Sequence, residues 1–321
     1  MDAPESPTRE PSAPPSQEPQ LRNWEEPDCL LCGGRQRELV VRAHDNAAPN
    51  DWHRYTVVRC MDCGLCYTSP RPTPAFIGAF YPESYAPYET PSPVRRLHWR
   101  SWLSTRFGWP FEPRRALQWH GKRRLLDFGC GGGSFLHRMN RLGWRAIGLD
   151  ISSVAIERVR GRLGLDALVG TLPHPELPAG GFDVLTMWHS LEHVHDPLAV
   201  LKSAHRLLAP GGRLLVAAPN IDSLPFRYFG PAWYGLDLPR HLTHFTPVTL
   251  QAMLKRAGFR VRRVLMLRHS RWQRESAALA RKEGVSLAWR GCVESKLGSR
   301  LFNACCSLTR QSDCMLIVAD R

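Results

Sequence analysis

The 321-residue sequence lacks any long hydrophobic run, any internal repeat and any charged-then-apolar stretch at its start. No apolar segment approaches the roughly 20 residues that a bilayer-spanning helix requires. The missing leader argues against secretion. We therefore expect a cytoplasmic protein without a transmembrane segment.

Acidic residues are scarce, with 29 Asp and Glu against 43 Lys and Arg, so the formal net charge is +14. A basic surface attracts nucleic acid, anionic membranes or phosphorylated substrates. Since no long unbroken basic run occurs, the pattern slightly favours charge spread over solvated faces. Ten cysteines in a cytoplasmic chain favour free thiols and metal binding over disulfides.

Composition divides the chain into four parts. Residues 1–26 are rich in Pro, Ser, Glu and Gln, which predicts a disordered tail. A small cysteine module is expected at 27–72. Residues 73–120 combine Pro, Trp and Tyr with arginine and predict a linker with a lead helix; contact with a membrane surface, RNA or a lipid-linked substrate stays open. An α/β domain is expected at 121–321, with a helical insertion at 270–312.

Apolar runs and helical patterns alternate through the last part, which predicts a parallel sheet with helices on both faces. Strands are expected at about 123–128, 145–149, 166–169, 182–187, 213–218, 259–267 and 314–319. Helices are expected around 133–142, 152–162, 197–208 and 247–257.

One short segment carries most of the chemical information. Asp127 is followed by glycines at alternate positions, Gly129, Gly131 and Gly133, between an apolar run and a helical pattern. This spacing differs from the dinucleotide fingerprint, and the preceding acid disfavours a pyrophosphate ligand. The acid favours a cationic head, such as the amino acid end of S-adenosylmethionine. Asp150 ends the next apolar run, where a carboxylate binds a ribose diol.

These residues resemble the first motif of class I S-adenosylmethionine-dependent methyltransferases, with Asp150 as the ribose-binding acid. The resemblance continues in order through 181–189, 190–197 and 207–216, and it covers about 122–270. It implies a Rossmann-like sheet of seven strands whose last strand is antiparallel. It also implies S-adenosylmethionine contacts at Asp127, Gly129, Cys130, Gly131, Asp150, Ile151 (adenine), Thr171 (adenine edge) and Trp188 (near the sulfonium).

Four cysteines form two pairs with two-residue spacing, Cys29 with Cys32 and Cys60 with Cys63, and glycine follows each pair. Such pairs predict a zinc ribbon, in which four thiolates leave no open position, so the Zn²⁺ would be structural. The alternative is unmetallated buried cysteines. The module is similar to the ribbon that precedes many bacterial class I methyltransferases acting on sugars or secondary metabolites; some ribosomal RNA methyltransferases carry one too.

Methyl transfer to oxygen or carbon usually needs a general base. His241, in the segment 237–246, is the first candidate; the alternative is a histidine that fixes the loop. His189 follows a strand end and is the second candidate, with a polar cap as its alternative. Glu192 and His193 match the Glu-His pair that quinone O-methyltransferases use around a metal. Those enzymes carry an acid where this chain has His189, which argues against a catalytic metal. Glu192 is the third catalytic candidate, and a His/Glu/His metal site is chemically possible, but a cap or packing role for Glu192 and His193 is favoured.

The leading hypothesis is O- or C-directed methyl transfer to a small-molecule acceptor: a sugar nucleotide, a glycan precursor or a secondary metabolite. The alternative is an RNA methyltransferase that uses the basic surface and the ribbon. The sequence has no N-P-P-[YF] motif and no catalytic cysteine pair for carbon methylation of RNA pyrimidines. A third, non-catalytic cofactor-binding role is disfavoured by the intact first motif. The oligomeric state stays open.

Overall fold

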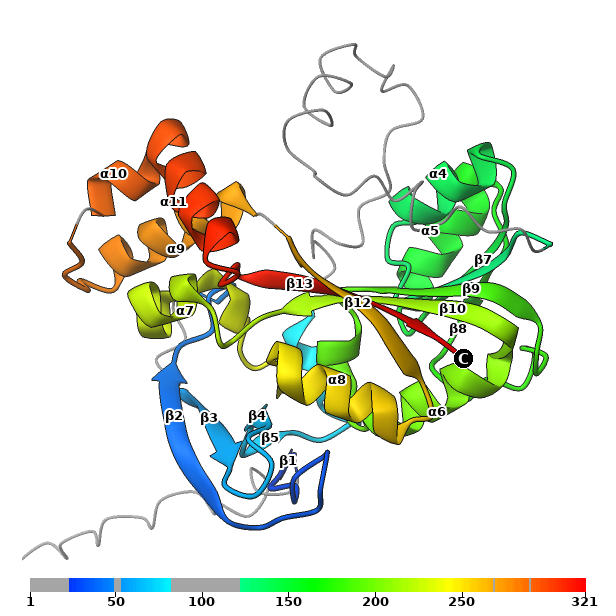
Figure 1. The fold of residues 1–321 in the computed structure, drawn as a ribbon, viewed down its shortest axis with the longest axis horizontal. Coiled ribbons are helices and arrows are strands. Elements are labelled where there is room, and N and C mark those ends of the chain that lie inside the picture. Colours follow the sequence, from blue (N-terminus) through cyan, green and yellow to red (C-terminus); the bar gives the residue numbers. More distant parts are fainter. Residues whose placement is uncertain (1–22, 49–52, 82–121, 268, 289) are drawn as a thin grey trace, which may run out of the picture.

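The computed structural model describes residues 23–48, 53–81, 122–267, 269–288 and 290–321 (Figure 1). The lead helix expected within 73–120 and most of the expected disordered tail lie outside these ranges.

A seven-stranded sheet forms the centre of the molecule, in the order β12-β13-β10-β9-β6-β7-β8. The strands β6 to β10 run parallel, and β13 runs antiparallel to both β10 and β12. The predicted class I methyltransferase sheet is therefore confirmed. Its strands are β6 (Arg124–Phe128), β7 (Arg145–Asp150), β8 (Ala167–Val169), β9 (Phe182–Trp188), β10 (Leu208–Pro219), β12 (Arg260–Leu267) and β13 (Cys314–Asp320).

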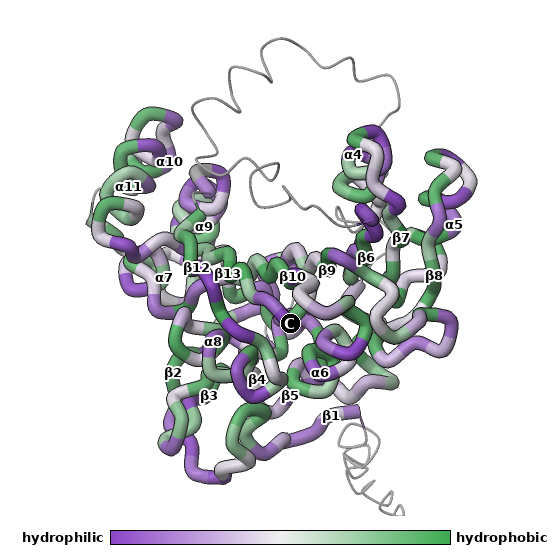
Figure 2. The backbone as a smooth tube through the Cα atoms, turned by 45° about the vertical axis from the view of Figure 1, so that its right-hand side comes forward, coloured by the Kyte–Doolittle hydropathy of each residue, from purple (hydrophilic) through white to green (hydrophobic). Residues whose placement is uncertain are grey.

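Helices cover both faces of this sheet, with α4 and α5 on one face and α6 and α8 on the other (Figures 1 and 2). Successive strand residues point to opposite faces. In β6, for example, Leu125 packs with the α4–α5 layer and Leu126 with the α6–α8 layer. Four helices make these layers: α4 (Ser134–Arg141), α5 (Ser153–Leu163), α6 (Pro197–Leu207) and α8 (Pro247–Arg256).

Local sequence sets where these helices begin. Ser152 and Asp196 accept hydrogen bonds from backbone N–H groups of the first turns of α5 and α6. Thr246 caps α8 and forms a reciprocal capping box with Thr249, and Pro247 occupies the first helical position.

The strand β10 is longer than the sequence pattern predicts. It begins at Leu208, which pairs with Phe182, whereas Arg213 pairs with Val184. Between these two pairs β10 advances by five residues and β9 by only two. The extra residues of β10 form an irregularity at the Pro-Gly-Gly turn. A proline and two glycines hide this strand start from a pattern based on apolar residues.

The amino-terminal module is a second sheet that shares a core with the first. Its order is β11-β4-β3-β2, and its strands are β2 (Arg37–Ala43), β3 (Tyr55–Cys60), β4 (Cys66–Thr68) and β11 (Thr243–His244). Leu65 and Tyr67 belong to the same apolar cluster as Met253 of α8. The module therefore packs onto the α8 side of the central sheet (Figure 1).

The expected disordered tail ends earlier than residue 26. Trp24 and Glu25 form β1 (Trp24–Glu25), which pairs with β5 (Arg71–Pro72). Glu25 accepts a hydrogen bond from buried Arg71. Its partner strand lies 46 residues away in the sequence, so composition alone misses the pairing.

Helices fill the stretch between β12 and β13 that was expected to be helical. These are α9 (Ser270–Lys282), α10 (Arg290–Glu294) and α11 (Lys296–Leu308). They lie beside the segment after β10, which holds α7 (Leu224–Phe229), η4 (Gly230–Ala232) and η5 (Tyr234–Leu236) (Figure 1). Two further short helices are η1 (Ile77–Phe80) and η3 (Leu191–His193). Within the described ranges, no helix has the length and apolar character needed to cross a membrane.

Candidate active site

The four cysteines of the amino-terminal module converge on one point. The Sγ atoms of Cys29 and Cys63 lie 3.4 Å apart, and those of Cys32 and Cys60 lie 3.5 Å apart. All four lie within 4.8 Å of one another. Four ligands about 2.3 Å from a tetrahedral zinc ion would be about 3.8 Å apart, so the cluster fits such an ion closely.

The two halves of this cluster have the same backbone geometry. Gly33 N–H donates to the Cys29 carbonyl (2.8 Å), and Gly64 N–H donates to the Cys60 carbonyl (2.9 Å). Both glycines have positive φ, +80° and +76°, which closes each turn without strain. The cysteine pairs are therefore two matched knuckles. All ten cysteines lie in the described residues and are free thiols.

The glycine turn after β6 lies against the end of β9. A Cβ atom on Gly129, whose φ is +71°, would lie 2.4 Å from Cβ of Ser190. Ser190 Oγ in turn donates to the Phe128 carbonyl (2.9 Å). Only glycine permits this close approach, which fixes the turn relative to the segment after β9.

Asp127 is buried just before this turn. Its Oδ1 accepts a hydrogen bond from Thr186 Oγ1 (2.7 Å) of β9. Burial, more than the nearby charge of Asp150, raises the pKa of Asp127 to about 7. A cation at this carboxyl group would restore its charged form, so the position fits the ammonium group of an amino acid ligand.

Asp150 ends β7 beside the same turn. Its two oxygens accept hydrogen bonds from the N–H groups of Gly131 (2.8 Å) and Ser152 (2.9 Å). Burial raises the pKa of Asp150 although these bonds oppose the shift. The next residue, Ile151, is 71% exposed, and Thr171 is exposed beyond β8. A carboxylate next to an exposed apolar side chain suits a ribose and its base.

Trp188 and Cys130 lie on the same side of the sheet in different environments. Trp188 packs against Phe135 (ring centroids 5.2 Å apart), and its buried Nε1 has no hydrogen-bond partner among the described residues. Cys130 is buried, and its Sγ fills the space beside Gly148. Burial raises the pKa of the Cys130 thiol, so this thiol is unsuited to nucleophilic chemistry.

His189 occupies a strained position immediately after β9. Its φ is +49°, which is uncommon for a residue with a side chain. The conformation places Nδ1 3.2 Å from Glu192 Oε1 and Nε2 3.6 Å from Cys314 Sγ. The ring also lies near the rings of His269 and Trp272. Whether His189 acts as a base or as a polar cap stays a prediction.

Glu192 is completely buried among histidines. Burial would raise its pKa, but the hydrogen bond from His189 and the charges of His189, His241 and His193 lower it. Its Oε2 is buried and has no partner among the described residues. Ligand atoms of Glu192, His193 and His241 lie within 4.8 Å of one another. Glu192 therefore lies in a buried acid–histidine cluster with His193 and His241, and its expected cap or packing role stays a prediction.

His241 lies in the loop between β10 and α8. Its Nδ1 is 3.0 Å from the Gly235 carbonyl, which can only accept, so Nδ1 carries the proton and Nε2 has the free lone pair. Nε2 lies 4.0 Å from Glu192 Oε1 and 3.8 Å from Asp237 Oδ2. Nε2 therefore faces two carboxylates at the edge of the acid–histidine cluster.

The loop that carries His241 is fixed to the ribbon by a buried arginine. Arg240 makes a bidentate pair with Asp45 of the ribbon (2.6 and 3.0 Å) and also bonds Asp237 (2.8 Å). Thr68 of β4 donates to the His241 carbonyl (2.7 Å). The ribbon therefore positions the loop, whereas the base role of His241 stays a prediction.

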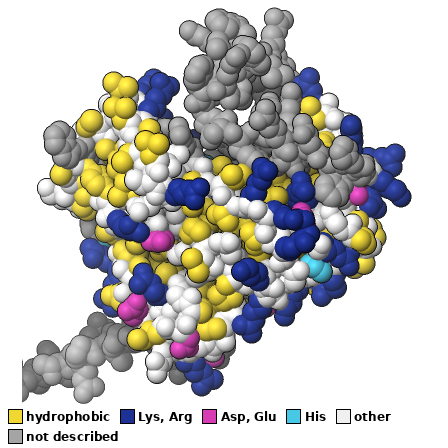
Figure 3. All heavy atoms as spheres, in the orientation of Figure 1, with side chains coloured by type: hydrophobic (Ala, Val, Ile, Leu, Met, Phe, Trp, Pro, Cys, Tyr) yellow, Lys and Arg dark blue, Asp and Glu magenta, His cyan; other side chains and the backbone are white. Residues whose placement is uncertain are grey.

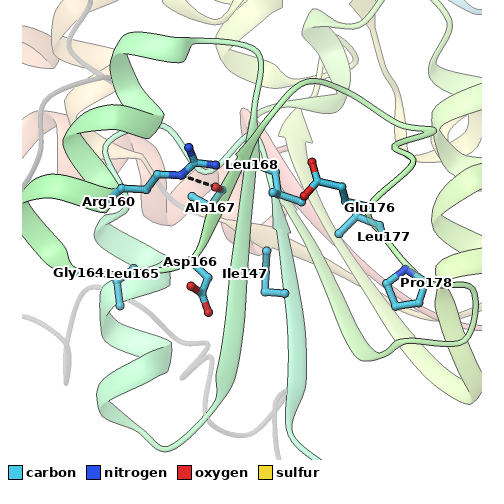
Figure 4. A pocket seen from close by; sticks show the side chains of 10 residues that line it. All are labelled: Ile147, Arg160, Gly164, Leu165, Asp166, Ala167, Leu168, Glu176, Leu177 and Pro178. Carbon is cyan, nitrogen blue, oxygen red and sulfur yellow. Dashed lines mark hydrogen bonds between the residues drawn. The ribbon is translucent and has the colours of Figure 1, made fainter.

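A groove of about 500 Å³ lies elsewhere, between β7, β8 and the segment 176–178, where Arg160 donates to the Ala167 carbonyl (Figure 4). Asp166, which lines the groove, precedes β8, whereas Asp150 ends the parallel neighbouring strand β7. The groove therefore lies toward the amino ends of these strands, away from the Asp150 carboxylate. Basic side chains are spread over the face in Figure 3 rather than gathered in one patch.

Sequence reasoning missed several residues of this site. Thr186 bonds Asp127, Asp237 approaches His241, and Cys314 approaches His189. Thr186 lies 59 residues from Asp127, Asp237 lies 4 from His241, and Cys314 lies 125 from His189. No local sequence signal indicates Thr186 or Cys314, because only the register of the strands brings each beside its partner.

A sheet of this order, with an acid and a glycine turn after its first strand and a second acid after the next, defines a class I S-adenosylmethionine-dependent methyltransferase. A sequence family described as "Methyltransferase domain" matches residues 89–264, more than half of the chain. The protein belongs to this methyltransferase family.

Known proteins resemble parts of the chain. A ubiquinone biosynthesis O-methyltransferase of Xanthomonas oryzae pv. oryzae (strain PXO99A) is 31% identical over 180 residues, covering 52% of this chain and 74% of the relative. One of the same name from Psychrobacter arcticus is 34% identical over 152 residues, covering 43% and 59%. A solved S-adenosylmethionine-dependent methyltransferase from Archaeoglobus fulgidus is 24% identical, covers 69% and 94%, and has a TM-score of 0.46.

Proposed function

We propose that the protein transfers the methyl group of S-adenosylmethionine to an oxygen atom of a small molecule, with His241 as the general base. The observation that carries the proposal is the geometry of His241, whose free Nε2 lies between two carboxylates. The similarity to relatives named for O-methyl transfer in ubiquinone biosynthesis supports an oxygen acceptor. Methyl transfer to carbon is the alternative.

Bound S-adenosylmethionine supplies an electrophilic methyl group on a sulfonium. In the proposed arrangement, Asp127 pairs with the ammonium group, Asp150 accepts from the ribose hydroxyls, and Ile151 lies against the adenine. Gly129, Gly131 and the backbone of Cys130 shape the turn beneath the ligand. Thr171 contacts the adenine edge and Trp188 lies near the sulfonium.

The chain's remaining task is to hold the acceptor and take its proton. The acceptor oxygen forms the new bond to carbon, and the electron pair of the breaking bond stays on sulfur. His241 Nε2 takes the hydroxyl proton, and Glu192 and Asp237 stabilise the resulting imidazolium. His189 holds Glu192 by its hydrogen bond. In-line positioning supplies most of the rate enhancement for such a displacement.

We also propose that the cluster of Cys29, Cys32, Cys60 and Cys63 holds a structural Zn²⁺. Four sulfur ligands at near-tetrahedral separations and two matched knuckles support this. Two contacts connect this module to the segment 237–246, here called the acceptor loop: Arg240 bonds Asp45, and Thr68 bonds the His241 carbonyl.

The test is a transfer assay with methyl-labelled S-adenosylmethionine and a host cell extract that is then separated into RNA, protein and small-molecule fractions. We expect label in the small-molecule fraction. The His241→Ala variant should lose about 10²- to 10⁴-fold of the rate, as removal of a general base does. Its matched control is His174→Ala, at a partly exposed histidine outside the acid–histidine cluster. Label in RNA would refute the small-molecule acceptor, and an unchanged rate for His241→Ala would refute the base assignment.

A further inference from the structure

We propose that His189, His269 and Cys314 form a second metal site, separate from the four-cysteine cluster and suited to a borderline-soft divalent ion such as Zn²⁺. One ligand atom from each of the three residues lies within 4.8 Å of the other two. Imidazole nitrogen and cysteine sulfur are the donors that zinc prefers.

The separation between two of these ligands fits a metal geometry. A tetrahedral ion about 2.3 Å from sulfur and about 2.0 Å from nitrogen separates the two ligand atoms by about 3.6 Å. Nε2 of His189 and Sγ of Cys314 are 3.6 Å apart. A simple thiol–imidazole hydrogen bond has a similar length, so the proposal also depends on the third ligand and on how His189 is held.

Glu192 supplies the second supporting observation. Histidines that bind metals usually direct their other ring nitrogen at a carboxylate or a carbonyl, which fixes the ring and its tautomer. Nδ1 of His189 lies 3.2 Å from Glu192 Oε1, on the opposite side of the ring from Cys314. Glu192, His189 and Cys314 thus have the order carboxylate, imidazole and thiol that is typical beside a zinc ion.

The fold holds these three ligands on rigid elements. His189 follows β9, and its N–H donates to the Ala217 carbonyl of β10 (3.0 Å). Cys314 is the first residue of β13 and pairs with Pro219 of β10 and Leu267 of β12. Since β13 is antiparallel, its start lies at the same edge of the sheet as the carboxyl end of β9. His269 follows β12 at this edge as well.

The strain at His189 is explained by the same site. Its φ of +49° turns the imidazole toward Cys314 and His269. Such conformations persist where the surrounding structure fixes them. Cys314 is completely buried, whereas the side chain of His189 is 30% exposed, so an ion can approach from the histidine side.

Three protein ligands leave one tetrahedral position for an exogenous ligand, which is the arrangement of catalytic rather than structural zinc. His189 is hydrogen-bonded to Glu192, which lies next to His241. If the proposed function holds, an acceptor oxygen would occupy the fourth position, and the ion would lower the pKa of its hydroxyl group. The binding of the ion itself does not depend on that function.

The experiment measures zinc in the full-length protein by mass spectrometry after dialysis against metal-free buffer. We expect about two zinc ions per chain in the wild type and about one in His269→Ala and Cys314→Ala. The matched control is Cys306→Ala, which removes another completely buried cysteine and should keep both ions. Zinc X-ray absorption of the wild type avoids any folding defect of a variant. It should show imidazole nitrogen, which the four-cysteine cluster cannot provide.

A stoichiometry of about one ion with a shell of sulfur alone would overturn the proposal. So would a second ion that survives both substitutions. Because the readout is metal content and ligand type, it stays distinguishable from any failure of the methyl-transfer assay.

Discussion

Replacing Arg240 by methionine tests the connection between the ribbon and the acceptor loop. Arg240 is 1% exposed and bonds two carboxylates, those of Asp45 and Asp237. The substitution keeps an apolar chain of similar length but leaves these carboxylates without their guanidinium partner. Breaking a buried pair in this way costs about 3–5 kcal/mol. With a urea dependence of about 3 kcal/mol per M, the unfolding midpoint should fall by about 1–2 M.

The assay is urea unfolding followed by circular dichroism, with Arg59→Met as the matched control. Arg59 pairs with Glu38 at 3.1 Å, but both side chains are about half exposed, and such a pair contributes at most about 1 kcal/mol. Adding Asp45→Leu to Arg240→Met should recover part of the loss, because it removes one of the unpaired charges.

Arg240→Met also distinguishes an effect on the acceptor from an effect on cofactor binding. Since Arg240 precedes His241, its loss should raise the acceptor KM or lower kcat while the Kd for S-adenosylmethionine stays unchanged. A midpoint shift no larger than that of Arg59→Met would refute the reasoning, as would a lower cofactor affinity with normal turnover.

Three further predictions follow from the cofactor turn and the ribbon. Asp127 must be charged to bind an ammonium group, and its pKa is about 7 in the free protein; cofactor affinity should therefore fall as pH decreases below 7, approaching about tenfold per pH unit, and calorimetry should find this slope absent in Asp127→Asn. Gly129→Ala brings a Cβ within 2.4 Å of Ser190 Cβ and should weaken cofactor binding about tenfold or more in the same assay; normal affinity would contradict the close approach. Cys60→Ser should release about one zinc ion per chain and lower the urea midpoint, whereas exposed Cys292→Ser should change neither.

The sequence predicts those parts of the fold that local patterns specify. Apolar periodicity predicts the ends of the central strands, and of the helices that cover them, to within one or two residues, except at the start of β10. The acid–glycine turn and the paired cysteines are also local signals, because the residues involved lie a few positions apart. Each of these features is set by the chemistry of a short segment and needs no knowledge of distant partners.

The rest depends on contacts between distant segments. Arg240 and Asp45 are 195 residues apart, and His189 and Cys314 are 125 apart. No pattern in either segment indicates its partner, because strand order and register bring them together. The sequence could therefore suggest His189 and His241 as candidates but could not show that an acid cluster, a thiol and the ribbon surround them.

These distant contacts explain why a ribbon accompanies this methyltransferase domain. The two-residue strand β11 comes from the acceptor loop, yet it pairs with β4 of the ribbon rather than with the central sheet. Thr68 of β4 bonds both the His241 carbonyl and His244 Nε2. A segment this short cannot hold its conformation alone, since isolated strand pairs are marginal in water. The ribbon therefore serves as the scaffold for the loop that carries the proposed base.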